Sequence, residues 1–256
     1  CYRDWSSDVC SSDLIELATS VGGMLRGHEL HRAGTGSILT DDAFPAKPYG
    51  RFNTDPLQRP PWEIWVNNKG QRFIREDEPF SEIRASALVK QDKFRYAIVF
   101  DDQILKSAPS GFSRWTDDEY QAHFNDHPMF FKADSLEELA KKADIDVKGL
   151  AQTIDAYNES VGSGSDPLGR EYMPRKISAG PYYAVIHLGS SATSSVGIVV
   201  DKDMRVLKED GTPIPNLYAA GEVLGSGSTL GHVFTPGMML TPALAIGRWL
   251  GMTLPV

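Results

Sequence analysis

The spacing of apolar residues changes along the chain from helical to alternating and back to helical. The segment IELATSVGGMLRG, residues 15–27, places apolar side chains at 15, 18, 21 and 25, which is one face of a helix. From Trp62 the apolar residues alternate instead, and Asn67-Asn68-Lys69-Gly70 separates residues 62–66 from residues 71–74. This pattern predicts a β-hairpin with a positive backbone φ at Gly70. Residues 96–100 are a second predicted strand.

Two helix starts follow the predicted strands. Ser135 precedes Glu138 by three residues, the spacing of a capping box. Asp146 begins the next predicted helix, whose apolar residues 147, 150, 151, 154, 157 and 161 form one stripe. Residues 162–165, GSGS, end it. Together with the hairpin, these helices predict a compact α+β unit over residues 41–188, entered through a proline-rich crossing at residues 45–61.

The last seventy residues have a different organisation. Residues 196–200 and 204–207 predict a hairpin, and residues 216–222, NLYAAGE, predict a buried strand that ends at a glycine. A Gly/Ser-rich loop and a strongly apolar helix over residues 238–250 follow. We therefore expect residues 15–40 and 189–256 to pack together as one α/β domain, with residues 41–188 inserted between them.

Residues 4–14, DWSSDVCSSDL, resemble a translated sequencing adapter. We interpret residues 1–14 as an artefact, the alternative being a natural disordered terminus. Both cysteines, Cys1 and Cys10, lie in this segment. The rest of the chain therefore lacks disulfides, cysteine metal ligands and a catalytic thiol, which is compatible with the cytoplasmic location that we expect.

Charge and motif content exclude several functions. The formal net charge is −8, so we expect no binding to nucleic acid or to an anionic membrane surface. No apolar run approaches the roughly 20 residues of a membrane span. His123 and His127 have the spacing of helical metal ligands, but Pro128 follows them and H-E-x-x-H is absent, so we predict no metal site. The absence of G-x-S-x-G argues against an α/β-hydrolase.

The strand, loop and helix near the C-terminus could hold an anionic ligand. Gly225, Gly227 and Gly231 allow a close approach of the backbone, and the start of the following helix presents unpaired N–H groups. The alternative is an ordinary loop before a core helix, because GSGSTLG misses the spacing of G-x-G-x-x-G by one residue. On these residues alone both interpretations stay open.

A family resemblance extends this argument. NLYAAGEVLG and GMMLTPALAIGRWLG resemble the C-terminal part of the FAD-dependent superfamily of fumarate reductases, succinate dehydrogenases and ketosteroid dehydrogenases. IELATSVGGML, WVNNKGQRFIRED, LAKKADIDVKGLAQTIDAYNESVGSGSDPLGR, GPYYAV and SVGIVVD match the same family in the same order, so the resemblance covers nearly all of residues 15–251. It implies an α/β flavin-binding domain, incomplete at its N-terminus, with an inserted α+β capping domain. It also implies that FAD is the cofactor.

The resemblance assigns residues to the cofactor. Gly221 and Glu222 are expected at the flavin, with Glu222 accepting a hydrogen bond from a ribityl hydroxyl. Backbone N–H groups around the start of the last helix are expected to face flavin N1 and C2=O, and such donors stabilise reduced flavin. The expected cofactor-binding residues in that turn are Gly237, Met238, Met239 and Leu240.

Departures from the family pattern concern the substrate. Fumarate reductases carry a histidine before T-M-G-G, where this chain has TSSVG at residues 193–197, and no arginine occurs between Glu222 and Gly247. We therefore reject a dicarboxylate. The loop is instead apolar, and GHVF at residues 231–234 resembles the G-H-T-Y of ketosteroid dehydrogenases, with Phe234 in place of the tyrosine. We expect an apolar, steroid-like or cyclic ketone substrate contacted by Thr193, Ser194 and Phe234.

The expected reaction is hydride transfer between flavin N5 and a C–C bond next to a carbonyl. The candidates for catalysis are Tyr183, His232 and Arg84, which is shifted from the position near Phe80 where the family has its acid arginine. The electron donor or acceptor is not identified by the sequence. The alternatives are amine or amino-acid oxidation on the same scaffold, and a non-enzymatic binding module or inactive fragment. Because the pyrophosphate-binding glycine motif is absent, we expect the chain alone to bind FAD poorly.

Overall fold

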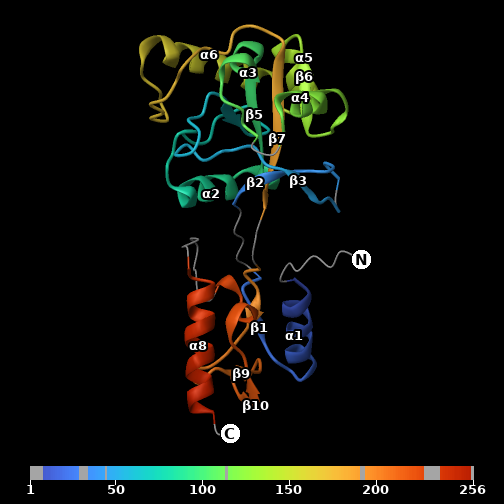
Figure 1. Ribbon diagram of the computed structural model, residues 1–256, viewed down its shortest axis with the longest axis vertical. Helices are drawn as coiled ribbons and strands as arrows, with labels where there is room; N and C mark the ends of the chain where they lie inside the picture. Colours follow the sequence, from blue (N-terminus) through green and yellow to red (C-terminus); the bar gives the residue numbers. More distant parts are fainter. Residues whose placement is uncertain are drawn as a thin grey trace. The chain divides into compact units, whose positions relative to one another are not determined.

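The computed structural model describes residues 8–28, 34–43, 45–112, 115–190, 194–227 and 237–254. Two compact units form the chain. Residues 1–32 and 191–256 make unit 1, and residues 33–190 make unit 2. Unit 2 is thus inserted in sequence between the two parts of unit 1, and Figure 1 shows the elements of each.

The elements of unit 2 are the strands β2 (Gly34–Leu39), β3 (Pro48–Gly50), β4 (Ile64–Val66), β5 (Arg95–Asp101), β6 (Phe130–Ala133) and β7 (Tyr182–Ser190), and the helices α2 (Ser81–Val89), η1 (Asp92–Phe94), α3 (Asp102–Ser107), α4 (Asp117–Asp126), α5 (Leu136–Lys142) and α6 (Val147–Ser163). The elements of unit 1 are α1 (Asp8–Ser20), β1 (Leu25–Arg26), β8 (Gly197–Ile198), β9 (Arg205–Leu207), β10 (Pro213–Tyr218), η2 (Gly221–Leu224) and α8 (Leu240–Thr253).

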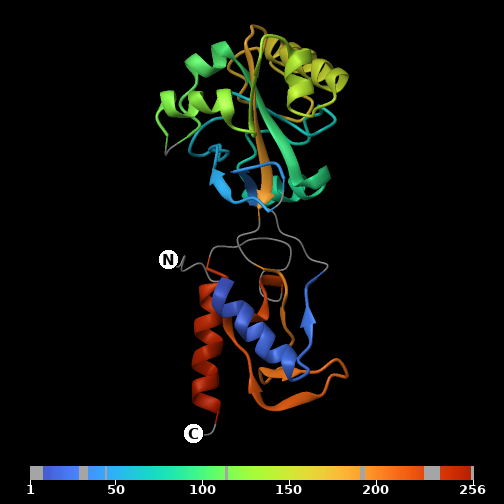
Figure 2. The same cartoon turned by 90° about the vertical axis from the view of Figure 1, so that its right-hand side faces the viewer.

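Unit 2 is built on an antiparallel sheet with β7 at its centre. The strand order is β3-β2-β7-β5-β4, and β6 pairs with the first half of β7 on the edge where β2 pairs with the second half. The strands β5 and β7 pair along seven residues and run the length of the unit, with α2 at one end and α5 and α6 at the other (Figures 1 and 2). Apolar side chains on both faces of β5 are buried, which makes this strand the centre of the core.

The turn of the hairpin predicted over residues 62–74 is confirmed, but its return strand is reduced to a single bridge at Arg72. The strand β4 ends at Val66, which forms an isolated bridge with Arg72, and Gly70 in the turn has a φ of +70°. A Cβ at Gly70 would lie 2.2 Å from the backbone nitrogen of Leu150. The turn therefore requires glycine for its backbone conformation and also for its contact with the start of α6. The strand predicted over residues 96–100 is likewise confirmed as β5.

Both predicted helix starts are confirmed by their N-caps. The hydroxyl of Ser135 accepts a hydrogen bond from the backbone N–H of Glu138 at 3.2 Å, and the carboxylate of Asp146 accepts one from Gly149 at 2.6 Å. The helix α6 ends at Gly164, in the left-handed conformation. Its residues Leu150, Ile154 and Tyr157 are buried as the stripe predicted. These caps are local, so the sequence was sufficient to identify them.

Two predictions about unit 1 and its boundary need correction. The strand β2, at residues 34–39, pairs with β7 and belongs to unit 2, whereas the sequence placed residues up to 40 with the C-terminal segment. The strand expected at residues 216–222 begins earlier, at Pro213, ends at Tyr218 and is largely exposed. Strand pairing decided both, and no local pattern encodes pairing between distant segments. Residues 8–14, interpreted as an artefact of sequencing, are helical and continue into the rest of α1.

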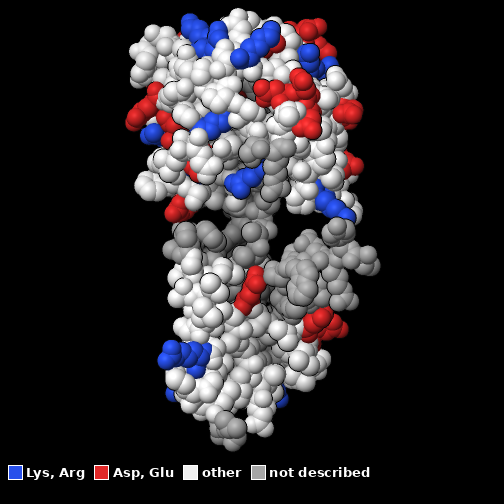
Figure 3. Space-filling view, viewed as in Figure 1, with Lys and Arg blue, Asp and Glu red and all other residues white. Residues whose placement is uncertain are grey.

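Unit 1 packs around η2. The helices α1 and α8 and the strand β8 all contact η2. Two two-stranded sheets, β1 with β8 and β9 with β10, complete the unit. Its buried residues are Ala18, Ile198, Val206, Ala219, Val223 and Leu224. Figure 3 shows charges of both signs over unit 2 and a largely uncharged face on unit 1.

Neither a membrane-spanning helix nor a cluster of metal ligands occurs in the described ranges. No helix within them is long and apolar enough to cross a membrane. No group of three or more His, Cys, Asp or Glu residues in the same ranges is placed to hold a metal ion. His123 and His127 of α4 instead pack among aromatic rings, and the Nδ1 of His127 accepts a hydrogen bond from the backbone of Met129.

Candidate functional site

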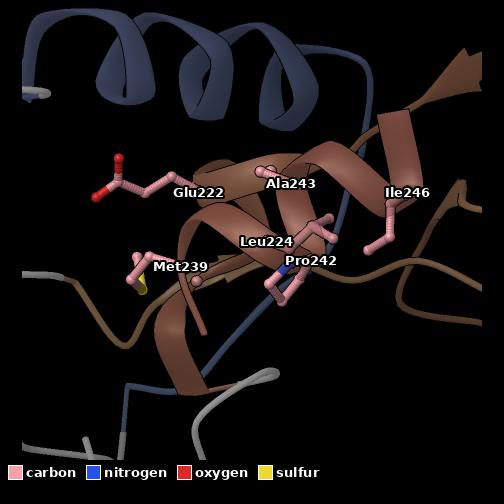
Figure 4. Close-up of a pocket in the computed structure, with 8 residues that line it drawn as sticks. Glu222, Leu224, Met239, Pro242, Ala243 and Ile246 are labelled. Atoms are coloured by element: carbon pink, nitrogen blue, oxygen red, sulfur yellow. The ribbon is translucent and has the colours of Figure 1, made fainter. Parts of the chain in front are cut away.

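A small cleft lies in unit 1 where η2 meets the start of α8. Its lining residues are Gly221, Glu222, Leu224, Gly225, Met239, Pro242, Ala243 and Ile246. Figure 4 shows the apolar side chains of Leu224, Pro242 and Ile246 grouped together, while the carboxylate of Glu222 extends away from them on the side of Met239. Among the residues that line this cleft, Glu222 has the one ionisable side chain, and it is exposed.

Close backbone packing shapes the wall of the cleft. A Cβ at Gly225 would lie 2.5 Å from the carbonyl oxygen of Ser195, and a Cβ at Gly197 would lie 2.0 Å from the nitrogen of Gly225. Neither position has room for a side chain. At Gly221 the situation is different, because among the described residues a Cβ there would meet the Cβ of Ala243 alone, at 3.8 Å. The backbone at the end of η2 therefore packs tightly against β8, whereas at Gly221 there is space for a side-chain atom next to α8.

The start of α8 borders this cleft through Met239. Met239 is the N-cap residue and makes no side-chain cap. The backbone N–H of Thr241 bonds to the carbonyl of Gly237 at 2.9 Å, so the N–H groups of residues 238–240 precede the first bond of this turn. The N-terminal end of a fourteen-residue helix carries a partial positive charge. Such N–H groups suit the edge of a ligand that carries electron-rich nitrogen or oxygen atoms.

The predicted cofactor residues fall in one place. Gly221, Glu222 and Met239 line the cleft, and Gly237, Met238 and Leu240 belong to the same turn at the start of α8. Ser194 is brought to the other end of η2, since its carbonyl accepts a hydrogen bond from the backbone of Ser226 at 2.9 Å. The remaining predicted site residues of unit 1, Thr193, His232 and Phe234, lie outside the described residues.

The two candidates in unit 2, Arg84 and Tyr183, line different cavities. Tyr183 is 4% exposed and stacks on Phe100, with ring centroids 5.4 Å apart. It borders a polar cavity of about 380 Å³ together with Asp102 and Lys132. Burial is the main cause that raises the pKa of the Tyr183 hydroxyl. The structure does not bring Arg84 and Tyr183 together.

Arg84 lines a larger groove of unit 2, with a volume of about 670 Å³. The residues that line this groove, which we call the arginine groove, are Ser37, Pro48, Tyr49, Gly50, Arg51, Asn53, Thr54, Asp55, Gln58, Ser81, Arg84, Phe112 and Trp115. Sequence reasoning identified Arg84 and missed Arg51 and the aromatic residues. No spacing signal exists for them, because β3, the start of α2 and the loop before α4 meet only in the folded unit.

A buried histidine lies close to the arginine groove. The Nε2 of His187 accepts a hydrogen bond from the backbone N–H of Phe52 at 3.2 Å, and its Nδ1 lies 3.2 Å from the hydroxyl of Tyr96. That hydroxyl donates to the carbonyl of Thr35 at 2.5 Å. Nε2 therefore accepts a hydrogen bond and Nδ1 carries the proton and donates one, which is the arrangement of a neutral imidazole. Complete burial lowers the pKa of His187 from 6.5 to about 3, and the positive charge of Arg51 acts in the same direction.

We expect acid to destabilise unit 2 through His187. Its folded pKa lies below its unfolded pKa, so the unfolded state binds more protons between about pH 6.5 and pH 3. The stability contributed by the neutral ring is complete above pH 6.5 and is lost progressively as the pH falls. From pH 7 to pH 5 the expected loss is about 2 kcal/mol. Urea denaturation at several pH values measures it, and the His187→Gln variant should lose less over the same range. Equal pH dependence in both proteins would contradict this account.

Comparisons with known proteins show the family to which the chain belongs. The sequence profile of the family described as "FAD binding domain" matches residues 58–231, more than half of the chain. The chain belongs to this family. Its fold is accordingly the flavin-binding fold of FAD-dependent oxidoreductases, with mixed α and β content.

Individual relatives carry different names. A probable fumarate reductase of Shewanella frigidimarina is 31% identical over 98% of this chain and 40% of its own length. A 4-oxocyclohex-2-ene-1-carboxylate 5-dehydrogenase of Sinomonas cyclohexanicum is 30% identical over 63% of this chain and 30% of its own length. The structure of a 3-ketosteroid Δ1-dehydrogenase from Sterolibacterium denitrificans matches 92% of this chain and 45% of its own chain, with a TM-score of 0.63 and 23% identity, which supports the fold alone. The chain thus spans less than half the length of these proteins.

Proposed function

We propose that this chain is part of an FAD-dependent oxidoreductase that transfers hydride between the flavin and a C–C bond next to a carbonyl of an apolar cyclic substrate. The observation that carries the proposal is the composition of the unit 1 cleft. Its side chains are apolar except for Glu222, which is acidic. This cleft offers no cation to a carboxylate among its described lining residues, and the groove of unit 2 that contains Arg84 has two arginines beside one aspartate, which suits one carboxylate better than two.

The unit 1 cleft fits the edge of a flavin. The backbone N–H groups of residues 238–240 suit the N1 and C2=O region, which becomes anionic on reduction, and the open backbone at Gly221 allows close approach. Glu222 would accept a hydrogen bond from a ribityl hydroxyl. When bound, the flavin supplies the hydride-transferring group, and the donors at the start of α8 favour its reduced form. In this proposal residues 1–32 and 191–256 are part of the FAD-binding domain.

Unit 2 is proposed as the capping domain. It has its own hydrophobic core, and its sequence lies between the two segments that form unit 1. A domain of this kind closes over the flavin, excludes water and positions the substrate. The arginine groove is the open surface of unit 2 that we assign to the substrate.

The proton-transfer role changes in the light of the structure. Arg84 was a candidate from the sequence, but a guanidinium stays charged near neutral pH and is better suited to bind an anion. Tyr183 is buried and borders a different cavity. His232, outside the described residues, is therefore the remaining candidate for proton transfer.

The relatives support a ring ketone as the substrate. The dehydrogenase of Sinomonas cyclohexanicum is named for a ring that carries a ketone and one carboxylate. The relative named as a fumarate reductase points to a dicarboxylate instead. We favour the first of these for this chain, because a ring with one carboxylate needs one cationic partner and a dicarboxylate needs two. A buried carboxylate without such a partner costs on the order of 3–5 kcal/mol.

We expect the product of the complete reading frame, loaded with FAD, to oxidise or reduce cyclic ketones in preference to succinate or fumarate. Dye-coupled turnover with a panel of cyclic ketones and both diacids measures this. The expected preference in kcat/KM is at least about 100-fold, the equivalent of roughly 3 kcal/mol. Efficient fumarate reduction would overturn the substrate proposal, and an absence of FAD binding would overturn the enzyme proposal.

A further inference from the structure

The arginine groove of unit 2 has a cationic wall and an aromatic wall. We propose that this groove binds a ring-shaped molecule with a single carboxylate, whose carboxylate lies against Arg51 and Arg84 and whose ring lies against Tyr49, Phe112 and Trp115. This deepens the proposed function, on which its catalytic meaning rests, by naming the charged group of the substrate and the residues that bind it.

The cationic wall has unused hydrogen-bonding capacity. Arg84 is only 5% exposed in its side chain, and its one hydrogen bond runs from Nη1 to the carbonyl of Glu78 at 2.5 Å. Its Nε is buried without a partner among the described residues. Arg51 is exposed and donates from Nη2 to the hydroxyl of Thr35 at 2.7 Å. Each guanidinium carries five N–H donors, so both retain donors for an anion.

The charges that face each other in the groove leave an excess of one positive charge. Asp55 is the one acidic residue among those that line it, and its Oδ1 lies 3.8 Å from the Nη2 of Arg84, too far for a hydrogen bond. Burial is the main cause that lowers the pKa of Arg84, and the charge of Arg51 acts in the same direction, while the charges of Asp55 and Glu78 oppose it. Arg84 already has one carboxylate within 4 Å, and no ion pair of Arg51 occurs among the described residues, so the two guanidiniums together suit one added carboxylate.

The aromatic wall is continuous. The ring of Trp115 lies between the other two, with centroids 5.3 Å from Tyr49 and 4.9 Å from Phe112. Gly50 allows this arrangement, since a Cβ there would lie 2.4 Å from the Cη2 of Trp115. The ring planes are tilted by 43° and 41° at these two contacts, so the three side chains form a curved apolar wall that offers a ring more contact than a short aliphatic chain would make.

The size of the groove agrees with such a ligand. A volume of about 670 Å³ lies within the range of small-molecule sites, roughly 300–1,000 Å³. It admits a ring and its substituent. A free phosphate would use the guanidiniums and leave the aromatic wall without a contact, so we assign the anion to a carboxylate on a ring.

The test is a calorimetric titration of the chain, without flavin, with cyclohexanecarboxylate. Cyclohexanecarboxamide has the same shape without the charge, and acetate and inorganic phosphate have charge without the ring. We expect cyclohexanecarboxylate to bind at least about tenfold more tightly than each of the other three. Because flavin is absent, a failed turnover experiment and a failed titration are separate results.

Two variants locate the binding. Arg51→Gln changes an exposed residue, and Arg84→Gln changes the buried one, so the first serves if the second fails to fold. Each should weaken binding of cyclohexanecarboxylate at least about tenfold. Arg175→Gln is the matched control, because Arg175 bonds to Ser107 and Gln103 outside the groove, and it should leave affinity unchanged. Equal binding of the carboxamide, equal binding of phosphate, or an unchanged affinity in Arg51→Gln would each overturn the proposal.

Discussion

Replacing Glu76 with alanine is expected to lower the free energy of unfolding of unit 2 by about 3–5 kcal/mol. Glu76 is completely buried and holds two arginines. Its carboxylate accepts hydrogen bonds from Arg72 Nε at 2.8 Å, from Arg72 Nη2 at 2.6 Å and from Arg170 Nη1 at 3.1 Å. It also accepts one from the backbone N–H of Trp65 at 3.0 Å, which ties the group to β4.

Loss of this carboxylate leaves two buried guanidiniums with less negative charge than they need. Arg170 is completely buried in its side chain and Arg72 is 8% exposed, so water cannot replace the lost partner. Asp166 would still pair with Arg72 at 2.5 Å, while Arg170 would keep only backbone carbonyls. The cost comes from the uncompensated charge as well as from the lost contacts.

Urea denaturation followed by tryptophan fluorescence measures the effect. Glu137→Ala is the matched control, because Glu137 pairs with Lys141 at the surface with both side chains 65% exposed. Removing an exposed pair of this kind should cost less than about 0.5 kcal/mol. Losses of similar size in the two variants would show that the buried network does not stabilise the unit.

Replacing Gly197 with alanine is expected to destabilise unit 1 by about 3 kcal/mol. A Cβ at this position would lie 2.0 Å from the nitrogen of Gly225 and 2.0 Å from the carbonyl carbon of Leu224. Both are backbone atoms, so no side-chain rotation can relieve the clash. The end of η2 would have to move away from β8, and the cleft next to it would change shape.

Hydrogen exchange detected by mass spectrometry can locate this effect. In Gly197→Ala the amides of unit 1 should lose protection while those of unit 2 keep theirs. Gly247→Ala is the control, because no atom lies within 4 Å of a Cβ at that position and it sits inside α8. Alanine there should stabilise the helix by about 0.5–1 kcal/mol. Unchanged protection in Gly197→Ala would mean that the contact between β8 and η2 is not rigid.

Features that depend on residues close in sequence were predicted, whereas contacts between distant segments were not. The caps at Ser135 and Asp146 and the turn at Gly70 were predicted correctly, because each depends on a side chain or a φ angle within a few residues. The strand β5 was predicted over residues 96–100, while its burial on both faces is seen only in the structure.

The sequence by itself determined several elements, among them β4, β5, α5, α6 and α8, and it placed Gly221, Glu222 and the start of α8 in one segment of the chain. Only the tertiary structure decided that β2 pairs with β7, that Tyr183 and Arg84 border different cavities, and that Arg51 and Trp115 line one groove. Caps and turns are set by interactions between residues close in sequence, which a pattern records directly. Residues of the arginine groove lie up to 78 positions apart, from Ser37 to Trp115. They meet because strand pairing and core burial bring their elements together, and no spacing along the chain encodes that contact.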